Sequence, residues 1–394
     1  MITIRQISKY FGFNDIRKTD VAFAFICAIT GIVLYLLPTG FEGAVSSKSQ
    51  SVRAQITAVD NESIHQIGLI KTGEQGLTVK ILDGRFRGEV FDTVNHFLGK
   101  LELDKFYKTG DRVFTVLTVE NNIIEGVTVV DRYRLNYEFF IIVIFCGFLL
   151  LYAGWTGFQA IISFFFTTLV LWKILLPGYL KYYDPVIFSM VIVTILTAVI
   201  IFLVAGFTKK GFVAFAGSMT GVFLTCFLAL FFGKFFNIPG EIKPFSETLL
   251  YIGFSKLDLS MIFLAGIFIS SAGAVMDIAM DVSASMAEIS EKNPDIHIMD
   301  LILSGFTVGR SVIGTMTTTL LFAYSGSFST MLMVFIAQGV PVDNILNVQY
   351  VSSEILHTVV GSFGLVTVAP LTAIAGGFIY GNYRKPVFKF MSKN

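Results

Sequence analysis

Long uncharged runs limit this chain to very few folds. The longest extends from Phe139 to Trp172, 34 residues without a charged side chain. About 20 apolar residues cross the hydrocarbon core of a bilayer as a helix, which satisfies its own backbone polar groups. Charged residues make up 14% of the chain, against about 25% in ordinary soluble domains. The sequence therefore predicts a polytopic α-helical membrane protein and argues against a soluble enzyme or a disordered chain. The near balance of 29 basic and 28 acidic residues gives no attraction to nucleic acid.

We predict about eight transmembrane helices with both termini cytoplasmic. Val21–Leu37 follows a basic leader and exceeds the apolar core of a cleaved signal peptide, about 7–15 residues, so we interpret it as a retained anchor. The run from Phe139 to Leu176 is too long for one span, and Gly154–Gly157 is a plausible turn between two short helices. The remaining spans are Pro185–Thr208, Gly211–Gly233, Leu259–Met276, Ser311–Val342 and Ile355–Tyr380.

The segment Ser311–Val342 admits two interpretations. It has Ser325-Gly326-Ser327 near its middle, so it could be one broken helix or a re-entrant pair. A single crossing leaves twelve lysines and arginines on the cytoplasmic side and four in the short outer loops. Because basic residues favour the cytoplasmic side, we prefer the single crossing.

Residues 39–137 are the one polar region, which this topology places outside the cytoplasm. Alternating or β-branched runs begin near Ala54, Leu77, Val113 and Gly126, and Asp83-Gly84 and residues 108–111 are typical of hairpin turns. About five short strands in so few residues predict a small all-β, OB- or SH3-like barrel between helices 1 and 2.

The predicted organisation has four parts. A leader with the first helix (1–38) is followed by the extracytoplasmic β domain (39–137), a seven-helix bundle (138–382) and a basic cytoplasmic tail (383–394). Within the bundle, residues 295–305 have the pattern of an amphipathic helix on the cytoplasmic surface. Gly217 and Gly221 form a GxxxG motif, which permits close helix packing.

A polar stripe in the sixth predicted span is the strongest functional signal. Asp277, Asp281, Ser285 and Glu288 recur every three to four residues and so share one helical face, which Ser270 and Gly273 extend. Carboxylates within a span usually face a bundle interior or a water path. Asp277 and Asp281 could therefore exchange protons or hold a hard cation, should a metal bind here. Alternatively, the span ends near Met276 and the acids face cytoplasmic water.

Further transport-path candidates lie in the last two spans. Arg310 enters from the same side as Asp277 and could pair with it, or could reach the membrane surface as an anchor. Thr315, Thr317 and Thr318 could line a polar path or bond to their own helix backbone. Glu354 and His357 are three residues apart on the last helix, as in proton relays or in a membrane-edge cap.

Enzymatic signatures are missing from the sequence. It has no Walker A motif, no His-Glu-x-x-His, no Gly-x-Ser-x-Gly and no Gly-x-Gly-Asp. Cys27, Cys146 and Cys226 lie in apolar runs without metal-ligand spacing. We therefore expect neither an enzyme nor a cofactor.

Three blocks of the sequence resemble the YibE/F-like family of bacterial multi-pass membrane proteins. They are residues 273–280, 309–324 and 353–373, and they include Asp277, Arg310 and Glu354. This chain departs from the family pattern with Thr318 in place of Asn and Asp281 in place of Ser. The blocks cover the C-terminal third, whereas the β region and first helices match in layout only. The resemblance implies a prokaryotic plasma-membrane protein and no particular activity.

Two functions from different classes are compatible with these features. The first is a secondary transporter or channel-like permease for an ion or small solute, coupled to protons or cations, with Asp277 central. The second is a sensory or assembly protein whose β domain binds a partner. Expected partners are the bilayer, an ion or small solute, and a second copy or another membrane subunit.

Overall fold

The computed structural model describes residues 17–42, 49–101, 103–120 and 123–381 and forms two compact units. One unit is residues 40–148, and the other combines residues 1–39 with 149–394. The basic leader around Arg5 and Lys9 and the tail predicted at 383–394 lie outside the described residues.

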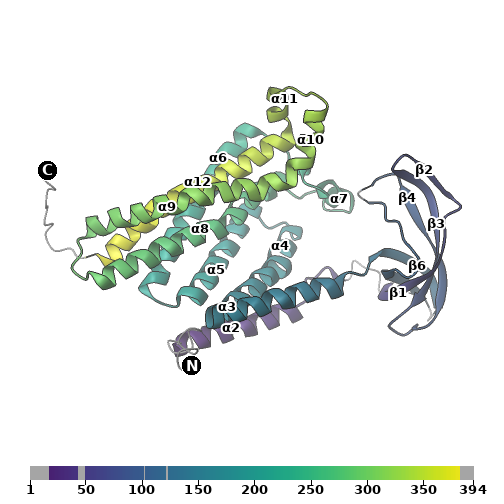
Figure 1. The fold of residues 1–394 in the computed structure, drawn as a ribbon, viewed down its shortest axis with the longest axis horizontal. Helices are drawn as coiled ribbons and strands as arrows, with labels where there is room; N and C mark the ends of the chain where they lie inside the picture. Colours follow the sequence, from purple (N-terminus) through teal and green to yellow (C-terminus); the bar gives the residue numbers. More distant parts are fainter. Residues whose placement is uncertain (1–16, 43–48, 102, 121–122, 382–394) are drawn as a thin grey trace, which may run out of the picture. The chain divides into compact units, whose positions relative to one another are not determined.

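Six antiparallel strands form a half-barrel in the first unit (Figure 1). Strand β1 is central and pairs with β3 and β5; β2 and β4 both pair with β3, and β6 pairs with β5. The strands are β1 Ser49–Asp60, β2 Ile64–Ile67, β3 Ile70–Ile81, β4 Val90–Leu98, β5 Arg112–Glu120 and β6 Ile123–Arg132. The prediction of a small all-β domain is confirmed, although the barrel is only half closed.

Apolar side chains at alternate positions of the strands form the core of this half-barrel. Ala54, Ile56, Leu77, Val79 and Val113 are at most 2% exposed, because side chains two residues apart point to the same face of a strand. The turn predicted at Asp83-Gly84 is present, and it continues to Gly88. Gly84 has a φ of 76° there, and strand β4 begins only at Val90.

Seven helices among the described residues are long and apolar enough to cross a membrane, which confirms a multi-pass membrane protein. They are α2 Lys18–Leu36, α3 Leu135–Val170 with its continuation to Leu180, α5 Pro185–Ala205, α6 Lys209–Phe236, α8 Leu259–Lys292, α9 Ile298–Ser325 and α12 Gln349–Tyr380. The shorter elements are η3 Leu171–Leu175, α4 Leu176–Leu180, η4 Gly240–Ile242, α7 Ser246–Tyr251, η5 Gly326–Phe328, α10 Ser329–Ala337 and α11 Val342–Asn347.

The longest of the seven, Leu135–Leu180, is interrupted at Gly154. This residue has φ 53° and ψ −121°, outside the helical range, at the position where the sequence predicts a turn. After it, Trp155 packs near Ala24 at the start of α2, and Val170 packs with Leu34 near its end. The segment after Gly154 therefore runs parallel to α2. Counting the two parts separately gives the eight crossings predicted from the sequence.

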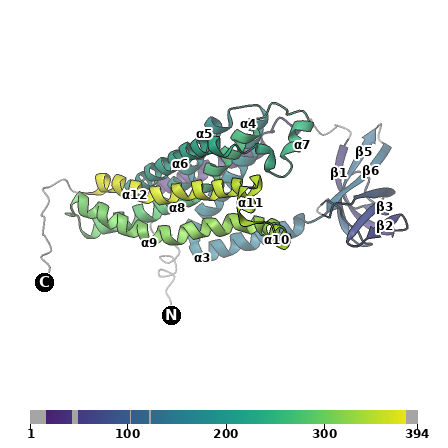
Figure 2. The same ribbon diagram turned by 90° about the horizontal axis from the view of Figure 1, so that it is seen from above.

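Helices α6, α8 and α12 pack against one another and form the centre of the bundle (Figure 2). Gly217 and Gly221 of α6 allow this packing, because a Cβ at Gly217 would lie 2.0 Å from Thr372 Oγ1 and one at Gly221 would lie 2.9 Å from Val275 Cγ1. The predicted GxxxG motif is thus a site of close helix contact.

Helix α9 differs from the expectation of a separate amphipathic surface helix near 295–305. It runs without interruption from Ile298 to Ser325, and Leu301 is fully buried in the bundle core. The predicted break at Ser325-Gly326-Ser327 lies beyond the threonines, where α9 ends in the short turn η5. One crossing is formed, because α10 has only nine residues.

The bundle has two ends, named here after the ends of α5. The Pro185 end also carries the start of α8 and of α12; the Ala205 end carries the start of α6 and of α9. Hydrogen bonds tie the Ala205 end together, with Ser283 Oγ 2.8 Å from the Lys210 carbonyl oxygen. The 21 residues of α5 span roughly 31 Å, close to the hydrocarbon thickness of a bilayer.

Candidate functional site

An ion pair lies in the half of the bundle nearest the Pro185 end. Lys243, directly after η4, pairs with Glu354 in the second turn of α12. The Glu354 side chain is only 12% exposed, against 42% for Lys243. The Lys243 ammonium also lies 5.4 Å from the ring centroid of Phe263 on α8. The pair therefore connects the α7–η4 region with two of the central helices.

His357 lies on the same face of α12, one turn further into the bundle. Its Nε2 is 2.6 Å from Ser270 Oγ on α8, and its ring meets Phe263 edge-on with 6.4 Å between centroids. Ser270 precedes Met276 by six residues, about 9 Å along the helix. Met276 packs with Ile201 of α5 near the Ala205 end, so the His357–Ser270 contact lies near the middle of the bundle.

Two cavities adjoin the ion pair. A cavity of about 550 Å³ is lined mainly by apolar side chains and by Lys243 and His357. A smaller one of about 150 Å³ is lined by Glu354 together with Phe328 and Leu321. The two partners of the pair thus belong to the walls of different cavities.

The predicted polar stripe is present as one face of a single helix. α8 continues to Lys292, well past Met276, and Ser270, Gly273, Asp277 and Asp281 are all exposed on it. A Cβ at Gly273 would meet nothing within 4 Å, so the stripe is open there. Met280 and Ala205 pack against the same apolar cluster, which places Asp277 within about one helical turn of the Ala205 end and Asp281 at that end.

Arg310 does not pair with Asp277 within the chain. Gly305 lies against Met286 and Gly309 against Val282, which makes α9 antiparallel to α8 and puts Arg310 level with Asp281. Among the described residues, however, no ion pair or hydrogen bond joins Arg310 to either aspartate. Of the two alternatives stated for Arg310, the pair with Asp277 is therefore not formed in the part of the chain that the structure describes.

The threonines of α9 bond to their own helix. Thr315 Oγ1 donates to the Val312 carbonyl at 3.0 Å and Thr318 Oγ1 to the Gly314 carbonyl at 3.4 Å. Thr317 Oγ1 donates to the Ile313 carbonyl. Thr315 and Thr318 are exposed and Thr317 is half-buried. Of the two alternatives for these residues, the structure shows backbone bonding.

Together these groups form a polar line along α8. It passes from Lys243 and Glu354 through His357 and Ser270, then over Gly273 to Asp277 and Asp281. Between Ser270 and Asp277 the line crosses about 10 Å without a titratable side chain. Asp277 and Asp281 are the carboxylates of this line that have no ion-pair partner among the described residues, and no group of three or more metal-ligating side chains occurs there either.

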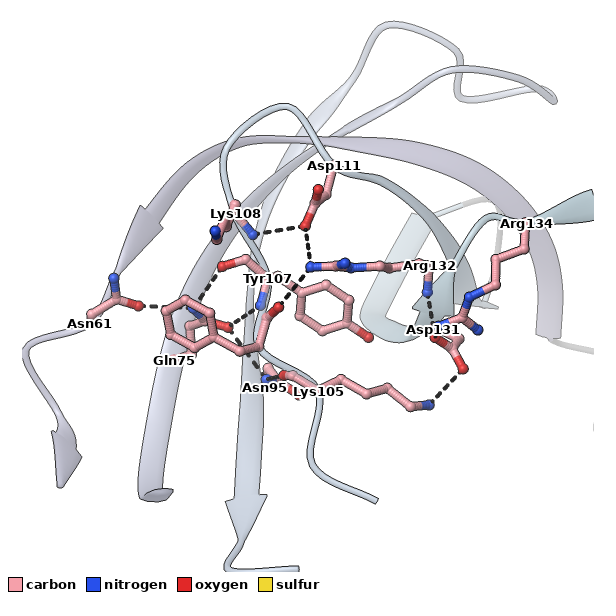
Figure 3. Close-up of polar contacts among 11 residues, drawn as sticks. Asn61, Gln75, Asn95, Lys105, Tyr107, Lys108, Asp111, Asp131, Arg132 and Arg134 are labelled. Carbon is pink, nitrogen blue, oxygen red and sulfur yellow. Dashed lines mark hydrogen bonds and ion pairs between the residues drawn. The ribbon is translucent and has the colours of Figure 1, made fainter. Parts of the chain in front are cut away.

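The half-barrel has a separate polar network (Figure 3). Gln75 is fully buried; its amide nitrogen donates to Asn61 Oδ1 at 2.8 Å and to the Tyr107 carbonyl at 3.0 Å. Its Oε1 accepts from the Tyr107 backbone N–H at 3.1 Å and from Asn95 at 3.4 Å. Every polar atom of the Gln75 side chain is thus used inside the protein, which makes this network structural.

The tip of the half-barrel is apolar. Ile67 and Leu69, on either side of the β2–β3 turn, are 80% and 79% exposed, and Leu98 on neighbouring β4 is 68% exposed. Exposed clusters of large apolar side chains mark contact surfaces.

The sequence missed Lys243 as the partner of Glu354, because the two are 111 residues apart. The sequence does show that Lys243 stands beside the apolar stretch that precedes α8, but this lysine was counted only as one of the charges in the outer loops.

Comparison with known families accounts for nearly the whole chain. The family described as YibE/F-like protein matches residues 141–382, and the YibE/F family N-terminal domain matches residues 47–131. No curated protein and no solved structure matches the chain.

Proposed function

This chain belongs to the YibE/F-like family, and on that premise we propose that it is a secondary transporter or channel-like permease for an ion or small solute. The observation that carries the proposal is the polar line along α8, which extends from the Lys243–Glu354 pair to Asp281. Ionisable side chains inside a membrane bundle are costly, and they mark ion or substrate pathways. The proposal requires no enzymatic step and no cofactor.

Asp277 is the central residue of the proposed path. It lies within the span, beyond the His357–Ser270 contact and before the Ala205 end, so an ion or proton leaving the middle of the bundle reaches it first. Asp281 lies four residues on, on the same face of α8, and a pair of carboxylates there suits coupling to protons or cations. Glu354 controls entry at the opposite end through its pair with Lys243.

The exposed face of α8 needs a cover in the bilayer. Asp277, Asp281 and Arg310, together with Thr315 and Thr318 on the neighbouring helix, are all exposed in the single chain. We therefore expect another helix surface to close this face, supplied by a second copy or a partner membrane subunit. Arg310 joins the path only in such an assembly.

The orientation proposed places the Ala205 end in the cytoplasm of a prokaryotic cell. Lys209, Lys210, Lys292 and Arg310 all lie at that end, in agreement with the preference of basic residues for the cytoplasmic side. The half-barrel, residues 39–137, then lies outside.

A second function is favoured by a different observation. The apolar tip of the half-barrel, with Ile67, Leu69 and Leu98 exposed, fits a partner-binding surface. A sensory or assembly protein would use this tip and would need no flux through the helices.

A flux assay in proteoliposomes tests the first proposal. Purified wild type, Asp277→Asn and the matched control Asp300→Asn, an exposed aspartate in the first turn of α9 away from the polar line, are reconstituted, and protons and a panel of monovalent and divalent cations are followed with fluorescent reporters. We expect flux in the wild type and the control, with a loss of about 10²-fold or more in Asp277→Asn. Equal flux in Asp277→Asn and the wild type would refute the assigned path. Absence of flux for every cation and for protons would favour the partner-binding function.

A further inference from the structure

A cavity of about 600 Å³ opens at the Ala205 end, away from the polar line. Its walls come from four places in the chain: Arg17 before α2, the start of α6, the end of α8, and Tyr380 at the end of α12. We propose that this cavity binds the phosphate of an anionic ligand, with the headgroup of an anionic phospholipid as the main occupant.

The charges around the cavity favour an anion. Arg17, Lys209 and Lys210 line it together with a single carboxylate, Glu291. Within the described part of the chain, none of these four side chains forms an ion pair. Lysines at the end of a span reach water in any case. Here, however, basic side chains from two distant segments converge on one hollow.

The backbone of the cavity adds to this preference. The 28-residue helix α6 begins at Lys209, and Thr208 caps it by accepting a hydrogen bond from the Gly211 N–H at 3.1 Å. The remaining N–H groups of the first turn and the positive end of the helix dipole attract anions.

The walls are held in place by contacts between the helices. Ser283 Oγ bonds to the Lys210 carbonyl at 2.8 Å and lies 3.3 Å from the Tyr380 hydroxyl. Ser290 Oγ donates to the Tyr380 carbonyl at 3.4 Å. The basic residues are therefore carried on a rigid junction of α6, α8 and α12.

The depth of the cavity favours a lipid over a free anion. The Ala205 end lies at one limit of the roughly 31 Å that α5 spans, which is where the hydrocarbon core ends and the headgroup region begins. Basic pockets between membrane helices at this level bind phospholipid headgroups. The inference is independent of transport, since none of these residues belongs to the polar line.

Binding of phosphatidylglycerol to the full chain in detergent provides the test. Native mass spectrometry compares the wild type with Arg17→Gln/Lys209→Gln/Lys210→Gln and with the matched control Lys234→Gln, which changes an exposed lysine at the opposite end of α6. We expect affinity for phosphatidylglycerol to fall on the order of tenfold or more in the triple variant and to be unchanged in the control. Lys209→Gln alone, an exposed substitution, should give a smaller loss and serves if the triple variant does not fold.

Two further ligands separate the sources of the phosphate. Phosphatidylcholine should bind more weakly than phosphatidylglycerol and should not distinguish the variants. Failure of inorganic phosphate to compete would support the lipid. Competition by inorganic phosphate at millimolar concentration would overturn the assignment of a lipid headgroup as the main occupant, and the cavity would then be a site for free phosphate. Equal binding of both lipids, or equal loss in Lys234→Gln and the triple variant, would overturn the proposal.

Discussion

His357 Nε2 lies 2.6 Å from Ser270 Oγ, so two helices from distant parts of the chain share a polar contact near the middle of the bundle. The contact stands between the Lys243–Glu354 pair on one side and Asp277 on the other. A proton or ion that follows the polar line has to pass it. Its removal should therefore change flux more than it changes folding.

Ser270→Ala tests this expectation. The change removes the contact with His357 and the hydrogen bond from Ser270 Oγ to the Ile267 carbonyl of the same helix, at an exposed position of α8. A hydrogen bond of this kind contributes about 1 kcal/mol, and the packing of α8 against α12 is left intact. We expect the apparent Tm in detergent to change by only a few degrees, while flux in proteoliposomes falls several-fold. Ser362→Ala, a hydroxyl on α12 that bonds to its own helix, is the control and should leave flux unchanged. Normal flux in Ser270→Ala would remove this contact from the path.

The Lys243–Glu354 pair should behave as a unit. Glu354→Gln leaves the Lys243 ammonium without its carboxylate beside apolar side chains, and Lys243→Gln leaves the more buried Glu354 without its cation. Each single change should destabilise the protein by about 1–3 kcal/mol. The swap Lys243→Glu/Glu354→Lys should recover part of that loss, as measured by thermal unfolding in detergent. Additive losses in the swap would show that the pair contributes no coupling energy.

Tyr107 offers a test in the half-barrel, because its side chain is fully buried and its hydroxyl has no hydrogen-bond partner among the described residues. Tyr107→Phe removes an unsatisfied polar group and should leave stability unchanged or raise it by up to about 1 kcal/mol. Gln75→Leu, in contrast, removes the side chain that bonds to both backbone groups of Tyr107 and should cost about 1–3 kcal/mol. Thermal unfolding of the full chain, followed by its β-sheet infrared band, distinguishes the two.

The same tyrosine predicts alkaline sensitivity. Burial raises the pKa of Tyr107 from its ordinary value of 10 to about 12. The folded state therefore retains the phenol proton more strongly than the unfolded chain does. The contribution of this proton to the free energy of unfolding is fully present below pH 10 and is lost as the pH rises through 12. In Tyr107→Phe, the unfolding temperature of the β-sheet band should no longer fall in this way at alkaline pH. An identical pH profile in the wild type and the variant would contradict the assignment.

The lengths of the uncharged runs were sufficient to predict the helices, and the alternation of apolar and polar residues was sufficient to predict the β domain. The non-helical Gly154 falls within the turn expected from Gly154 and Gly157, and alternation placed β1, β3 and β5 correctly. The turn after Gly84 was harder, because Arg85-Phe86-Arg87 alternates like a strand although the chain is turning there. Residues 295–305 were also difficult to predict, because an amphipathic pattern is compatible with two structures. It suits a helix on the membrane surface, and it equally suits the first turns of α9, where one face packs on the bundle.

The candidate site could be predicted only in part. A helical period is local, so Asp277 and Asp281 could be placed on one face of α8. Which neighbours those side chains meet depends on how the helices pack, and spacing carries no such information. Lys243 therefore went unrecognised as the partner of Glu354. The pair of Arg310 with Asp277, one of the two alternatives stated for Arg310, is not formed among the described residues.

Two glycines on different faces of the bundle should respond oppositely to the same substitution. Gly217→Ala places a methyl group about where Thr372 Oγ1 now lies, 2.0 Å from the added Cβ, so α6 and α12 must separate. Overpacking of this kind costs about 1–3 kcal/mol, which should lower the apparent Tm in detergent. Gly273→Ala adds the same group where nothing lies within 4 Å, and removing a flexible glycine from a helix should raise stability by about 0.5–1 kcal/mol. If Gly273→Ala also reduces flux while it stabilises the fold, the open stretch of α8 between Ser270 and Asp277 is part of the path; unchanged flux would place the path elsewhere.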